Sequence, residues 1–136
     1  MLQQQEPDDY VIATGETHSV KEFVNLAFDH AGIEIEWRGS GANEKGFVKS
    51  FAPNLQPLTS NLNVGDVLIE LDPRYFRPLD VEFLQGDASK ARKKLNWEPK
   101  IKFKELVKIM VDADIKNLEE MKQCQDVIRK LSNNKK

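Results

Sequence analysis

Two arginines and an acid lie close together in the segment DPRYFRPLDVEFLQGD, residues 72–87. The guanidinium groups of Arg74 and Arg77 suit bidentate binding of phosphate or carboxylate. Their three-residue spacing places them on one face if the segment is helical and on opposite faces if it is extended. Pro78 stiffens the backbone directly after Arg77, and Asp80 offers a carboxylate that can accept hydrogen bonds from vicinal ribose hydroxyls. These residue types suit the binding of a nucleoside diphosphate.

A second interpretation of the same residues needs no ligand. Arg77 precedes two acids, Asp80 and Glu82, and can form an exposed ion pair with either of them. For Arg74, packing or an ion pair with Asp72 is the simpler assignment. Exposed ion pairs are common and contribute little stability, so the residue types alone do not separate this interpretation from ligand binding.

The chain before this segment predicts a strand, a helix and a second strand. Residues 10–13, Tyr-Val-Ile-Ala, form a short apolar run that is typical of a buried strand. Ser19 and Glu22 match a capping box at the start of a helix, in which each side chain satisfies a free backbone N–H. Gly32 follows as the stop signal of that helix. IEIEWRG, residues 33–39, alternates apolar and polar residues as a half-buried strand does.

The remaining elements are a loop, a strand and two helices. Residues 39–66 are rich in Gly, Pro, Asn and Ser, which predicts a long loop, and DVLIELD, residues 66–72, predicts a strand. Asp87 is a candidate N-cap for a short helix. A long helix with an apolar face is expected from about Lys104, and residues 121–136 are expected to be a helical extension with a frayed tail.

These elements predict the α/β class, or α+β for this chain taken by itself, with a few short strands and flanking helices. A strand that is apolar on both faces, as residues 10–13 are, expects parallel neighbours on each side. The sequence offers no candidates for those neighbours, so we expect the chain to be part of a larger domain. An exposed strand edge at residues 10–14 would also favour self-association.

Composition argues against several functional classes. The chain has 136 residues, 40% of them hydrophobic and 31% charged, as is usual in globular domains. Its net charge of -2 argues against general nucleic-acid binding. The single cysteine, Cys124, excludes an internal disulfide, and His18 and His30 lack ligand partners at metal-site spacing. No apolar run reaches the length of about 18 residues that spans a membrane, and the first residues do not form a secretory signal. A cytoplasmic protein without membrane contact is expected.

Three segments together resemble one enzyme family. YVIATGETHSVKEFV, DPRYFRPLDVEFLQGD and KARKKLNWEPKIKFKELV are similar to the C-terminal part of the GDP-mannose 4,6-dehydratases, in the extended short-chain dehydrogenase/reductase superfamily. The resemblance implies that residues 1–120 are the C-terminal substrate-binding portion. It also implies that Arg77 contacts the diphosphate of the sugar nucleotide and that Asp80 contacts the ribose. The family usually has RPTEV where this chain has RPLDV, so Asp80 keeps the charge with a shorter reach.

The resemblance further implies what the parent enzyme does. That enzyme is expected to be a lyase that uses NADP to convert GDP-mannose into GDP-4-keto-6-deoxymannose, the first step toward GDP-fucose. The parent is also expected to be a homo-oligomer, either a dimer or a tetramer. Two alternatives stay open: a related sugar-nucleotide epimerase or reductase, and a non-catalytic binding or interaction module.

The motifs that hold the cofactor and perform the chemistry in such enzymes are missing from this sequence. GSGANEKG does not open a helix after a parallel strand, as a dinucleotide-binding turn does. The Tyr-x-x-x-Lys pair is also missing, because Thr14 and Leu79 stand four residues after Tyr10 and Tyr75. The chain is therefore expected to lack most of the Rossmann core, to carry no catalytic residue, to bind no cofactor alone and to be inactive by itself.

Overall fold

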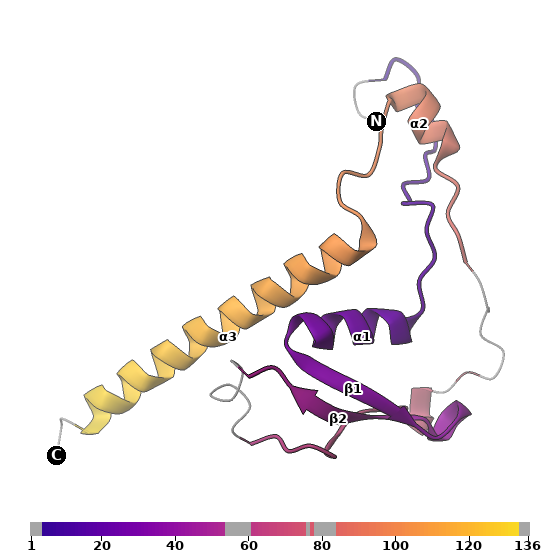
Figure 1. The fold of residues 1–136 in the computed structure, drawn as a ribbon. Coiled ribbons are helices and arrows are strands. Elements are labelled where there is room, and N and C mark those ends of the chain that lie inside the picture. The colour runs from indigo at the N-terminus through magenta and orange to yellow at the C-terminus, as the bar shows by residue number, and fades with distance from the viewer. Residues whose placement is uncertain (1–3, 54–60, 76, 78–83, 134–136) are drawn as a thin grey trace.

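The structure is a computed structural model that describes residues 4–53, 61–75, 77 and 84–133, with side chains described up to residue 126. Helices and strands are both present in the described residues (Figure 1), so the predicted mixed α/β class is confirmed. The helices are α1 (Val20–His30), α2 (Ser89–Leu95) and α3 (Phe103–Asn133). The strands are β1 (Ile33–Arg38), β2 (Lys45–Phe51) and β3 (Val67–Glu70). Short 3-10 turns span Gly41–Asn43 and Pro73–Tyr75.

The described strands form one antiparallel sheet in the order β1-β2-β3. The turn between β1 and β2 requires glycine at position 39. Gly39 has a φ of +91°, and a Cβ on it would lie 2.5 Å from the carbonyl oxygen of Asn43. Gly39 and Gly41 therefore belong to a connection between antiparallel strands and do not open an α-helix.

Strand β2 lies inside the region predicted to be a loop, residues 39–66, so the prediction is wrong for this part. Gly46 and Val48 are the buried positions of β2. The alternation is hard to see in KGFVKSF because the glycine offers no apolar side chain at a position that faces inward. A Cβ on Gly46 would lie 3.1 Å from the Ile35 side chain, so the glycine lets neighbouring side chains cover the strand closely.

Helix α1 begins and ends as its sequence predicts. The Ser19 hydroxyl accepts the backbone N–H of Glu22 at 3.0 Å, and Gly32, with a φ of +78°, follows the end of the helix. The Glu22 side chain does not complete the capping box, because its carboxylate lies 3.0 Å from the imidazole Nδ1 of His18. Only the serine half of the predicted cap is therefore confirmed.

Polar contacts connect α1 to the sheet. The indole N–H of Trp37 on β1 donates to the Asn25 side chain at 2.7 Å. The ammonium group of Lys21 lies 2.7 Å from the Glu44 carboxylate and 4.7 Å from the centre of the Trp37 ring. Both contacts join exposed residues of α1 to the β1–β2 hairpin. They therefore help to orient the helix on the sheet.

Helix α3 packs its first turns against α1 and then continues beyond it (Figure 1). Val107 in the packed part is 1% exposed, whereas Leu118 and Met121 farther along are exposed. The helix crosses residue 120 without a break, where the domain prediction places the end of the substrate-binding portion; that boundary stays a prediction. In the described part of the chain, no helix is long and apolar enough to cross a membrane.

The strand predicted at residues 10–13 is absent from the structure. The segment is extended but belongs to no sheet, and Val11 and Ile12 are 54% and 47% exposed. A strand forms only when a neighbour accepts its backbone hydrogen bonds, and the described residues offer no such neighbour to this run. The prediction of a buried strand is therefore wrong for these residues in the described structure.

Candidate functional site

Arg74 lies in the 3-10 turn that follows β3 and is held by an ion pair with Asp72. Its Nη2 lies 2.6 Å from Asp72 Oδ2, its Nε donates to the same carboxylate at 3.0 Å, and its backbone N–H donates to Asp72 Oδ1 at 3.0 Å. Hydrogen bonds from the Arg74 side chain and backbone hold the pKa of Asp72 below its usual range. The expected ion pair is confirmed, and it occupies the guanidinium group of Arg74.

Arg77 is exposed and lies beyond the end of this turn. The turn stops at Tyr75, so Arg77 does not continue the helical geometry that would place both arginines on one face. Asp80, the other predicted binding residue, lies outside the described residues, and so does Glu82. The contacts predicted for Arg77, with a nucleotide or with either acid, therefore stay predictions.

Residues 84–86, which follow this segment, are fixed against the N-terminal part of the chain. The Thr17 hydroxyl donates to the carbonyl oxygen of Leu84 at 2.9 Å, and the Gln85 side-chain amide donates to the carbonyl oxygen of Gly15. Gly86 lies against Ala13 so closely that a Cβ on the glycine would be 2.5 Å from the alanine Cβ. Residues 13–17, which belong to no sheet, therefore hold residues 84–86 in place.

Charged contacts also join the N-terminal segment, residues 8–17, to α2. The Arg92 guanidinium donates to the carbonyl oxygen of Thr14 at 3.2 Å. The Lys94 ammonium lies 3.0 Å from the Asp8 carboxylate, which Lys90 also contacts. The hydrogen bond from Lys90, followed by the one from Lys94, holds the pKa of Asp8 well below its usual range. The N-terminal segment and α2 are therefore joined along their length.

Asp87 acts at the start of α2, as its sequence position predicts. Its carboxylate accepts the backbone N–H of Ser89 at 2.8 Å and also contacts the Ser89 hydroxyl. These hydrogen bonds lower the pKa of Asp87. The N-cap position of the helix is occupied by Ala88, so the prediction of Asp87 as the N-cap is wrong by one position, although its carboxylate still binds the first backbone N–H of α2.

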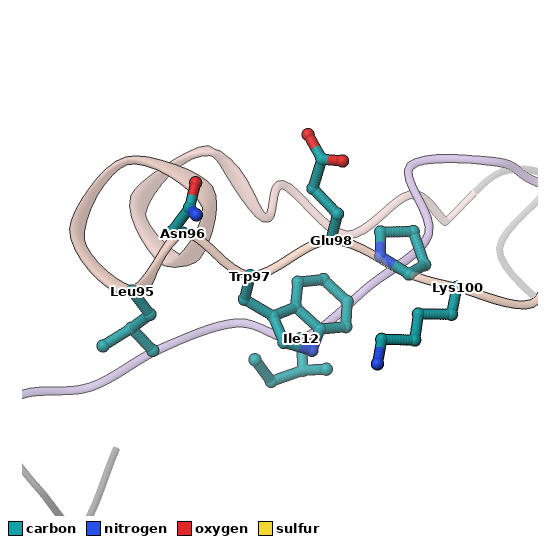
Figure 2. Close-up of a pocket in the computed structure, with 7 residues that line it drawn as sticks. Ile12, Leu95, Asn96, Trp97, Glu98 and Lys100 are labelled. Carbon is teal, nitrogen blue, oxygen red and sulfur yellow. The ribbon is translucent and has the colours of Figure 1, made fainter.

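A hollow lies where the N-terminal segment passes the end of α2. It is lined by Ile12 and by residues 95–100. Figure 2 shows the Trp97 indole beside Ile12, while the Glu98 carboxylate points away from both. The side chains of Ile12 and Trp97 make part of its surface apolar. The hollow does not include Arg77, so it does not form the predicted nucleotide site.

The contacts that hold residues 84–86 against residues 13–17 were not predicted from the sequence. Each of them joins residues about 70 positions apart, such as Thr17 with Leu84 and Gly15 with Gln85. No periodic pattern encodes pairings of this separation. The one available signal was Gly86, since an isolated glycine between structured segments often marks a close approach of two backbones.

The other titratable groups of the described residues do not meet the requirements of a metal site. No group of three or more His, Cys, Asp or Glu side chains there is arranged to hold a metal ion. Tyr75 is exposed beside Arg74, with the guanidinium 5.7 Å from its ring. His18 and His30 each contact a carboxylate, and both lie next to α3.

Comparison with known proteins identifies the family. A sequence model of the family described as GDP-mannose 4,6 dehydratase matches residues 1–110. The chain belongs to this family. It is 50% identical over 115 residues to a GDP-mannose 4,6 dehydratase of Drosophila melanogaster and 48% identical over 115 residues to the human one. A GDP-mannose 4,6-dehydratase of Vibrio cholerae is 45% identical over 116 residues.

These alignments cover most of this chain but a minor part of its relatives. Each alignment includes 85% of this chain. The aligned residues make up 26% of the Drosophila protein, 27% of the human protein and 30% of the Vibrio protein. The GDP-mannose 4,6 dehydratase match includes Arg77, Asp80 and every contact described above between the N-terminal segment and α2. It ends inside α3, so the outer part of this helix lies outside the family match.

Proposed function

We propose that this chain is the sugar-nucleotide-binding portion of a GDP-mannose 4,6-dehydratase. In this proposal Arg77 contacts the diphosphate of GDP-mannose and Asp80 contacts its ribose. The observation that carries the proposal is membership of the family, with identities of 45% to 50% to the relatives compared above. The names of these relatives favour a dehydratase over the alternative epimerase or reductase.

The surroundings of the two arginines support the choice of Arg77. The Arg74 guanidinium already pairs with Asp72 through Nε and Nη2, so a phosphate there would compete with that carboxylate. Arg77 lies two residues after Tyr75, the last residue of the turn, and is exposed. A guanidinium group can bind two phosphate oxygens at once, which neutralises charge and fixes the orientation of the diphosphate.

The role of the chain in the reaction is binding and orientation. The parent enzyme is proposed to be a lyase that converts GDP-mannose into GDP-4-keto-6-deoxymannose with NADP, and to act as a homo-oligomer in the cytoplasm. The glycines at positions 39 and 41 belong to the β1–β2 connection and do not fit a dinucleotide cradle, which needs a strand followed by a helix. We therefore propose that other parts of the protein hold NADP and supply the general acid and base.

Calorimetric titration of the 136-residue chain with GDP-mannose and UDP-glucose tests the substrate class. GDP-mannose is expected to bind, and UDP-glucose is expected to bind at least about tenfold more weakly, which corresponds to about 1.4 kcal/mol. Circular dichroism of the same sample checks that the helices are formed. Equal affinities in a folded sample, or no binding of GDP-mannose, would contradict the proposal.

A further inference from the structure

The two histidines of the chain lie at opposite ends of α1, and both contact α3. His18, just before the helix, stacks on the Phe103 ring with the ring centres 3.7 Å apart and the planes at 6°. His30, the last residue of the helix, has its Nε2 2.7 Å from Asp112 Oδ1. The packed part of α3 therefore contacts one imidazole at each end of α1. Imidazole is the side chain whose charge ordinarily changes near neutral pH.

The surroundings of His18 favour its protonated form. Its Nδ1 lies 3.0 Å from the Glu22 carboxylate and its Nε2 lies 3.4 Å from the Glu16 carboxylate. A neutral imidazole has one N–H and can donate to only one of them, whereas an imidazolium donates to both. Lys102, directly before α3, lies 3.9 Å from Glu16 and is the opposing positive charge.

His30 contacts α3 directly at the other end of α1. Asp112 faces it from α3, and Asp29 precedes it on α1. Lys108 and Lys116 lie one turn before and after Asp112 on α3. The contact between His30 and Asp112 therefore anchors α3 to the end of α1.

We propose that the packing of α3 against α1 is proton-linked, with His18 as the proton-binding residue. Proton uptake strengthens the contacts of His18 with two carboxylates while its ring stays stacked on Phe103. Loss of the proton leaves one ring nitrogen facing a carboxylate without a hydrogen to share. In this proposal the first part of α3 has two states. In one it is packed on α1, with contacts at both ends of that helix, and in the other it is released from α1.

The direction of the pH dependence follows from the shift at His18. Its hydrogen bond with Glu22 is the main cause that raises the pKa of His18 above the ordinary value of 6.5. A group whose pKa is raised by folding stabilises the fold fully below its unfolded pKa, and this stabilisation is lost as pH rises through the folded pKa. The packing of α3 is therefore expected to be tightest below about pH 6.5, down to the pH at which the carboxylates become protonated.

Two measurements on the 136-residue chain test this linkage. NMR titration of His18 is expected to give a pKa above 6.5, and Glu22→Gln, which keeps the backbone N–H that Ser19 caps, is expected to lower it. Amide-exchange protection of residues 106–112, corrected for intrinsic exchange, is expected to fall between pH 6 and pH 8. His18→Gln is expected to remove most of this fall.

Several results would overturn the proposal. A His18 pKa at or below 6.5, or one that Glu22→Gln leaves unchanged, would show that the two carboxylates do not favour the imidazolium. Unchanged pH dependence of α3 protection in His18→Gln would show that another group carries the linkage. If His18→Gln does not fold, the titrations of the unmodified chain and of Glu22→Gln still decide the question.

Discussion

Gly86 packs directly on Ala13, and the contact leaves no space for a side chain at position 86: a Cβ there would lie 2.5 Å from the Ala13 Cβ. This contact joins residues 84–86 to the extended N-terminal segment. It is reinforced by the hydrogen bond from Thr17 to Leu84. The position of residues 84–86 therefore depends on a pairing with residues 13–17 that neither helix nor strand periodicity predicts.

Gly86→Ala is expected to destabilise the chain through this contact. The added methyl group overpacks against Ala13, which typically costs about 1–3 kcal/mol. Urea unfolding measures the change in the free energy of unfolding. Ala13→Gly removes the opposing methyl group, so the double variant Gly86→Ala/Ala13→Gly is expected to be more stable than the sum of the two single changes predicts. Simple additivity would show that the two residues are not in contact.

Val107→Ala is expected to reveal the contribution of the α1–α3 core. Val107 is 1% exposed, and removing two buried carbon atoms costs about 2 kcal/mol when transfer and cavity terms are combined. Val20→Ala is the matched control, since Val20 begins α1 and is 80% exposed. The control is expected to change the free energy of unfolding by less than about 0.5 kcal/mol. Equal effects of the two variants would contradict the described packing of α3.

Asp8→Asn is expected to change the acid sensitivity of the chain. The contacts with Lys90 and Lys94 lower the pKa of Asp8 in the folded state from its ordinary value of 3.8. A group with a lowered folded pKa stabilises the fold above its unfolded pKa, and this contribution is lost as pH falls through the folded value. The variant is therefore expected to show a weaker fall in urea midpoint below about pH 4 than the unmodified chain.

Asp9→Asn is the control for this measurement because it leaves both lysine contacts of Asp8 in place. It is expected to keep the acid dependence of the unmodified chain. If Asp8→Asn and Asp9→Asn have the same acid profile, the ion pairs between the N-terminal segment and α2 do not contribute to stability in solution.

Local patterns predicted most of the elements. Helix α1 was predicted from its cap at Ser19 and the glycine after its end, β1 from the alternation of IEIEWR, and α3 from its apolar spacing. Each of these signals lies within the element itself, where backbone geometry determines which residues share a face. The resemblance to the family was also carried by contiguous segments, and the family match confirms it.

Features that depend on distant partners were not predicted. Residues 10–13 have the composition of a buried strand but lie outside the sheet, because sheet formation depends on neighbours that local sequence does not specify. Strand β2 was missed because Gly46 occupies an inward-facing position. For the candidate site, the ion pair of Arg74 was foreseen from its adjacent acid, whereas the support of residues 84–86 required the three-dimensional structure.

We propose that Arg77, and not Arg74, binds the diphosphate. Calorimetric titration of GDP-mannose into Arg77→Ala and Arg74→Ala tests it most directly, because the two changes remove the same side chain three positions apart. Loss of hydrogen bonds to a charged group costs about 1.5–3 kcal/mol, so Arg77→Ala is expected to weaken binding at least about tenfold. Arg74→Ala, which breaks the ion pair with Asp72, is expected to stay within about twofold of the unmodified chain, a difference below about 0.5 kcal/mol. Equal losses in the two variants, or an unchanged affinity in Arg77→Ala, would contradict the assignment.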